Sequence, residues 1–87
     1  MRINDSFVLR RIHHIYMLIP IKYNDVSNNV ISLNNTAAQI FLDCIHHDNA
    51  ETLSNAISIQ YGLSEIDKIN IYNYISSLIE NRFLFVD

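Results

Sequence analysis

Residues 30–41 read VISLNNTAAQIF, and the hydrophobic pattern changes in the middle of this stretch. Residues 30–33 are apolar and partly β-branched, a composition that favours a β-strand. The apolar side chains after the two asparagines have the i, i+3, i+4, i+7 spacing of one helix face, and they are Ala37, Ile40, Phe41 and Cys44. Asn34 or Asn35 can accept a hydrogen bond from the free amides of the first helical turn. The stretch therefore predicts a strand that leads directly into a helix.

Two further strands are predicted before this corner. The first is FVLRRI (7–12), and the second is IYMLIPIKY (15–23). The second strand has apolar residues on both faces, which favours a central position in the sheet. The segment NDVSNN (24–29) is a turn cluster. Strand 30–33 is then the third strand of an antiparallel sheet and lies at its edge.

Two more helices are predicted after the first. The second helix ends at Gly62, where a left-handed residue is favoured; its inward residues are Leu53, Ala56, Ile57 and Tyr61. The third helix spans 64–81, and it begins with Ser64 and Asp67 in a spacing similar to a capping box. A tight turn joins these two helices, as in a helix-turn-helix. Three strands followed by three helices predict an α+β fold in one domain, residues 1–87.

Composition limits the classes of partner. The net charge is −3 and the six basic residues are scattered, whereas nucleic-acid binders concentrate basic residues on one face. The apolar run IYMLIPI (15–21) is much shorter than the roughly 18 residues of a membrane helix. We therefore expect neither a nucleic-acid nor a membrane partner. Cys44 is the only cysteine, which excludes an internal disulfide and is typical of a reducing cytoplasm.

No motif indicates catalysis. The pairs His13-His14 and His46-His47 are adjacent residues, and neighbouring side chains on a strand point to opposite faces. No third ligand has zinc-site spacing, so we expect turn or surface histidines. Cys44 lies on the buried helix stripe, where burial raises a thiol pKa and makes a nucleophile improbable. A single glycine excludes a glycine-rich phosphate loop. The prediction is a protein without enzymatic activity, metal or cofactor.

The third helix carries two apolar stripes. The first is expected to face the core and consists of Ile71, Tyr74, Ile75 and Leu78. The second is offset around the helix, with Ser76 beside it, and consists of Ile69, Tyr72 and Ile79. This second stripe either packs under the C-terminal segment FLFV (83–86) or lines a groove. An edge strand has unpaired amides and carbonyls, so a groove beside strand 30–33 would suit β-augmentation by an extended peptide.

These elements resemble the PqqD family, which takes its name from coenzyme PQQ synthesis protein D. The resemblance covers residues 7–86. Its most specific part is the family skeleton "LR…VPV…LN-x-TAA". In this chain the skeleton is matched by Leu9-Arg10, Ile19-Pro20-Ile21 and residues 33–38.

The resemblance implies a winged-helix-like fold of three strands and three helices. It also implies a peptide-recognition role in the biosynthesis of ribosomally made, modified peptides. The protein would bind the leader of a precursor peptide and present it to a modifying enzyme, such as a radical-SAM maturase or a leader peptidase. The leader would add beside the third strand and pack on the third helix. The residues implied for peptide binding are Val30, Ile31, Ser32, Leu33, Ile69, Tyr72, Ser76 and Ile79.

Two alternatives remain open. A winged-helix DNA-binding regulator would place the third helix in the major groove. However, the charged residues in and just after this helix leave it slightly negative, whereas phosphate contacts require Lys and Arg. These charged residues are Glu65, Asp67, Lys68, Glu80 and Arg82. The other alternative is a small oligomerisation module, a homodimer paired through the edge strand.

Overall fold

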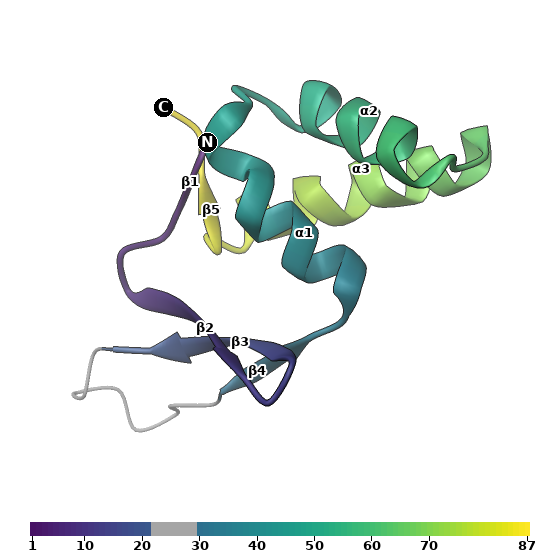
Figure 1. The fold of residues 1–87 in the computed structure, drawn as a ribbon. Helices are drawn as coiled ribbons and strands as arrows, with labels where there is room; N and C mark the ends of the chain where they lie inside the picture. Colours follow the sequence, from purple (N-terminus) through teal and green to yellow (C-terminus); the bar gives the residue numbers. More distant parts are fainter. Residues whose placement is uncertain (22–29) are drawn as a thin grey trace.

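The computed structural model describes residues 1–21 and 30–87. It has the predicted α+β fold, an antiparallel sheet followed by three helices (Figure 1). The strands are β1 Arg2–Ile3, β2 Phe7–Ile12, β3 Ile15–Pro20, β4 Ile31–Leu33 and β5 Leu84–Phe85. The helices are α1 Asn35–Asp43, the one-turn 3-10 helix η1 Cys44–His46, α2 Ala50–Tyr61 and α3 Glu65–Glu80. The predicted turn at 24–29 lies outside the described residues.

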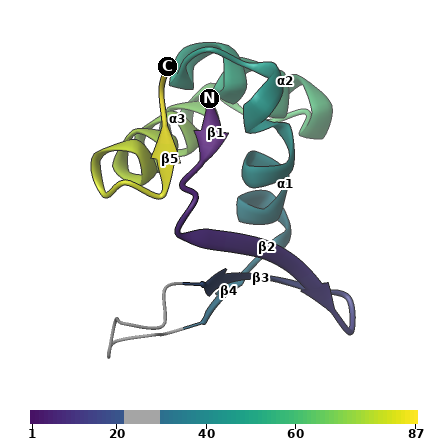
Figure 2. The ribbon, with the colours of Figure 1, turned by 90° about the vertical axis from the view of Figure 1, so that its left-hand side faces the viewer.

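The main sheet has the strand order β2-β3-β4, with antiparallel neighbours. The prediction that β3 is central and β4 an edge strand is confirmed. β4 pairs with β3 through Leu33 opposite Tyr16, and Ile31 opposite Leu18. All three helices lie on one face of this sheet (Figures 1 and 2). The arrangement is winged-helix-like, with β4 leading into α1 at the predicted corner.

A second, two-stranded sheet joins the two ends of the described chain. β1 and β5 pair antiparallel, with Ile3 opposite Leu84. Leu84 is fully buried, so this ribbon closes the core beside α1 (Figure 2). The sequence does not predict this sheet, because two-residue strands have no hydrophobic period that could be recognised.

Each of the α-helices α1, α2 and α3 begins with a side-chain cap. The Asn34 Oδ1 accepts a hydrogen bond from the Ala37 amide at 2.8 Å, which settles the choice between the two asparagines. Ser64 caps α3 through its hydroxyl oxygen, as predicted. Gly62 ends α2 with φ +63°, in the left-handed region that the sequence predicted. These local interactions fix where α2 ends and where α3 begins, and the two helices pack against each other.

The core lies between the sheet and the helices. Its largest fully buried side chains come from every layer and include Leu18, Ile40, Leu53, Ile57, Ile75 and Leu84. Two predicted core residues differ from expectation. Tyr61 is exposed because it is the last residue of α2, and Tyr74 is 41% exposed because it faces a groove.

Candidate functional site

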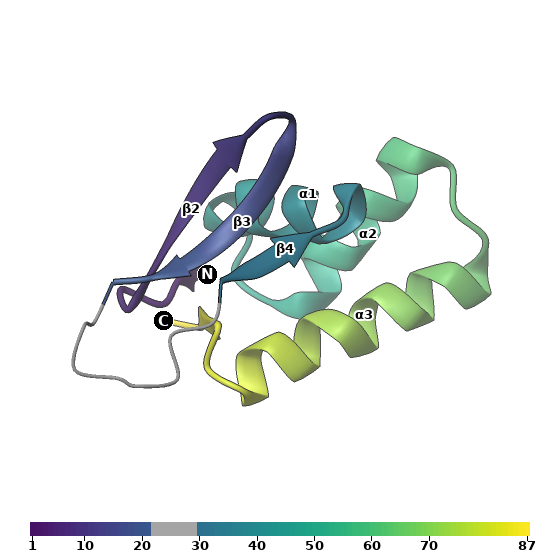
Figure 3. The same cartoon turned by 90° about the horizontal axis from the view of Figure 1, so that it is seen from below.

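The free edge of β4 is the starting point of the site. β4 hydrogen-bonds to β3 on one side, and no strand among the described residues pairs with its other side. Its outward backbone amides and carbonyls are therefore available to another chain. Seen from below, α3 runs roughly parallel to β4 on its open side (Figure 3), and Figure 1 shows that α3 does so in the helical layer over the inner face of the sheet. The two elements form the walls of a groove.

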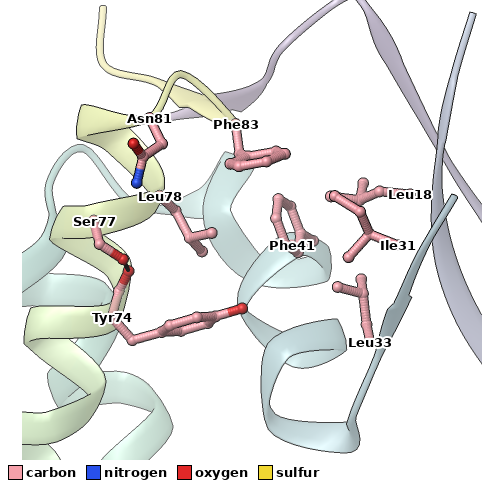
Figure 4. Close-up of a pocket in the computed structure, with 9 residues that line it drawn as sticks. All are labelled: Leu18, Ile31, Leu33, Phe41, Tyr74, Ser77, Leu78, Asn81 and Phe83. Atoms are coloured by element: carbon pink, nitrogen blue, oxygen red, sulfur yellow. Dashed lines mark hydrogen bonds between the residues drawn. The ribbon is translucent and has the colours of Figure 1, made fainter. Parts of the chain in front are cut away.

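The groove has a volume of about 260 Å³ and an apolar floor. Side chains alternate along a strand, so Ile31 and Leu33 point toward the helices while Ser32 points away. The lining residues come from β3, β4, α1, α3 and the segment after α3, and they are Leu18, Ile31, Leu33, Phe41, Tyr74, Ser77, Leu78, Asn81 and Phe83 (Figure 4). Such a floor suits an apolar side chain of an extended peptide.

The α3 wall supplies the polar groups of the groove. In Figure 4 the Tyr74 side chain extends from α3 toward α1 and Leu33. The phenol of Tyr74 is a hydrogen-bond donor at neutral pH, and burial raises its pKa further above the ordinary value. The Ser77 hydroxyl donates to the Tyr74 carbonyl at 2.7 Å, so its hydrogen bond is already made within α3. Tyr74 and Asn81 are therefore the side chains of this wall that can donate to a ligand, and the Ser77 Oγ can still accept.

The structure brings together only part of the predicted site. Ile31 and Leu33 line the groove, and Val30 and Ser32 are exposed beside it. Ile69 and Tyr72 lie on the opposite flank of α3, where they line a separate depression with three residues of α2 and Lys68. Ser76 is half-buried, and Ile79 packs against the core. The second stripe thus does not share the groove with β4.

The sequence does not reveal the α3 wall, and the reason is geometric. The core stripe of α3 has a flank on each side, and the sequence does not show which flank meets the sheet. Ile69 and Tyr72 lie on one flank, and Ser77 and Asn81 lie on the other. The recognisable signal was the i, i+3, i+4, i+7 spacing of Tyr74, Ser77, Leu78 and Asn81. Tyr74 was assigned to the core because an aromatic residue within an apolar stripe gives no sign of a groove.

None of the other candidate groups lines this groove. Burial raises the pKa of the Cys44 thiol, and its Sγ donates to the Phe41 carbonyl. His13 and His14 form the β2–β3 turn, and both are exposed with positive φ. Within residues 1–21 and 30–87, no group of three or more His, Cys, Asp or Glu side chains could hold a metal ion.

The fold and groove define a class: a small winged-helix-like α+β domain whose edge strand adjoins an apolar groove. No family model, curated protein or solved structure matches this chain. Across the described part of the chain, every helix is too short or too polar to cross a membrane.

Proposed function

We propose that this protein binds the leader segment of a ribosomally synthesised precursor peptide by β-strand addition to β4. It then presents the precursor to a modifying enzyme, such as a radical-SAM maturase or a leader peptidase. The observation that carries the proposal is the edge of β4 with which no described strand pairs, directly beside the apolar groove. The resemblance of residues 7–86 to the PqqD family supports the assignment of the peptide as a leader.

The length of β4 determines how binding energy is divided. β4 has only three residues, so a docked strand gains few ladder hydrogen bonds. Each bond contributes about 0.5–1.5 kcal/mol net, so the ladder alone gives weak binding. The groove must supply the remainder through an apolar leader side chain placed on Ile31, Leu33 and Phe41. Main-chain bonds then set the register, and the groove sets the specificity.

Charge disfavours the DNA-binding alternative. α3 contains three acidic residues and a single basic residue, Lys68. The Lys68 Nζ lies 4.0 Å from the Glu65 Oε1. A recognition helix needs Arg or Lys to contact phosphates. If the protein bound duplex DNA with a submicromolar Kd that rose steeply with salt concentration, the DNA-binding alternative would be favoured over leader binding.

The first test needs a precursor leader, which the proposed function predicts to be encoded near the gene for this chain, made as a synthetic peptide. Two versions carry N-methyl groups on alternate backbone amides, in the two complementary registers. Calorimetric titration should show that one version binds at least about tenfold more weakly than the unmodified peptide, because the amides that would donate to β4 are methylated. The other version should bind within about twofold of the unmodified peptide, because its methylated amides point away from β4. Equal affinities for both versions would exclude strand addition.

The second test is a matched pair of tyrosines on α3. Tyr74 and Tyr72 are 41% and 43% exposed, but only Tyr74 lines the groove beside β4. Tyr74→Ala should weaken leader binding about tenfold or more through lost contact area and a lost donor, and Tyr72→Ala should bind normally. Titrations of both variants, with thermal melts alongside, make the comparison. If Tyr72→Ala alone loses binding, the leader packs on the flank that the sequence stripe indicated.

A further inference from the structure

The outer face of the main sheet, opposite the helices, is largely apolar. The inward positions of the strands alternate with outward ones, and the outward residues are Val8, Arg10, Ile12, Ile15, Met17, Ile19 and Ser32. The register places them side by side, with Val8 opposite Ile19 and Met17 opposite both Arg10 and Ser32. We call this set the outer face.

No element among the described residues covers the outer face. All the helices lie on the other side of the sheet in two perpendicular views (Figures 1 and 2). Ile12 and Ile15 are 43% and 47% exposed. An antiparallel sheet with one solvated face normally alternates apolar-in and polar-out. An outer face with one charge and one hydroxyl instead has the composition of a protein contact surface.

Charge indicates what kind of surface covers it. Residues 7–21 contain two arginines and no acidic residue, although the chain has a net charge of −3. The exposed Arg10 makes no ion pair with any described residue, and its one hydrogen bond reaches the neighbouring Leu9 carbonyl at 3.4 Å. Face-to-face packing of two copies would bring their basic hairpins together without a carboxylate on either face. A partner with an apolar surface and a carboxylate opposite Arg10 satisfies both features.

The outer face is continuous with the proposed leader site. A strand added to β4 extends the sheet, and alternate leader side chains then point to the same side as Met17 and Ser32. A protein that covers the outer face therefore contacts the bound leader as well. We propose that the outer face is the docking surface for the modifying enzyme, through an apolar patch that carries an Asp or Glu opposite Arg10. This inference rests on the proposed function.

The test uses a purified modifying enzyme, which the proposed function predicts to be encoded near the precursor gene, with the protein saturated by leader. Met17→Glu places an acidic charge at the centre of the outer face and should weaken enzyme binding at least about thirtyfold. Ile59→Glu makes the same charge change on α2, at a residue that is 83% exposed, and should stay within about twofold. Arg10→Gln should weaken binding about tenfold and flatten its salt dependence.

Leader affinity, measured separately for each variant, should be unchanged. An enzyme that binds Met17→Glu and Arg10→Gln as tightly as wild type, or that does not bind wild type at all, overturns the inference. Sedimentation of the wild-type protein and of Met17→Glu checks for a dimer. If the wild type is a dimer and Met17→Glu dissociates it, the inference is overturned, because a second copy would then cover the outer face. If wild type fails to bind the leader, the proposed function fails, and the leader titration shows this without the enzyme. Should Met17→Glu not fold, Arg10→Gln decides the outcome.

Discussion

Ser77→Trp is expected to abolish leader binding, with a loss of about a hundredfold or more, equivalent to about 2.8 kcal/mol. Ser77 lines the groove between β4 and α3, whose volume is about 260 Å³. An indole at this position occupies the space that an apolar leader side chain needs, and it also blocks the approach of a strand to β4. The fold should survive, because the groove opens to solvent and the indole does not enter a closed core.

The matched control is Ser76→Trp. Ser76 is the next residue of α3, about 100° around the helix, and it does not line the groove. Calorimetric titration with the synthetic leader should give near wild-type affinity for Ser76→Trp and none measurable for Ser77→Trp. Far-UV circular dichroism and a melt of each variant check the fold. If Ser77→Trp binds normally and Ser76→Trp does not, the peptide lies on the α2 side of α3.

Ile75→Ala is expected to lower the free energy of unfolding by about 2–5 kcal/mol. Ile75 is 0% exposed and belongs to the core cluster. The truncation removes buried apolar surface and leaves a cavity that the surrounding side chains fill only in part. For a domain of 87 residues this is a large share of the total stability. Urea unfolding measures the change, provided that the slope of the unfolding free energy against urea concentration is the same for both proteins.

Ile69→Ala makes the same truncation on the same helix at a side chain that is 53% exposed. It should cost less than about 1 kcal/mol, because much of the side chain already contacts water. A cost for Ile69→Ala equal to that for Ile75→Ala would show that the second stripe is buried in the folded protein.

Local patterns of the sequence predicted much of the fold. The change of period after Asn34, the left-handed Gly62 and the hydroxyl of Ser64 specify where helices begin and end, because each acts on backbone groups within a few residues. The apolar residues on both faces of β3 predicted its central position, and therefore the free edge of β4. Two of the nine residues that line the candidate groove, Ile31 and Leu33, follow from that edge.

The sequence by itself thus determined the strand–helix order, the helix caps and the edge strand, since all depend on short-range periodicity and capping. Only the tertiary structure decided which flank of α3 meets β4, because that depends on how α3 is rotated as it packs against α2 and the sheet. The rotation of α3 is the reason that Tyr74 and Ser77, rather than Tyr72 and Ser76, face the groove. The pairing of β1 with β5 is likewise a long-range contact between two-residue strands with no periodic signal. The outer face has the same origin: apolar residues on both sides of β3 suit a covered strand, but three helices on one face leave Met17 and Ile19 on the other.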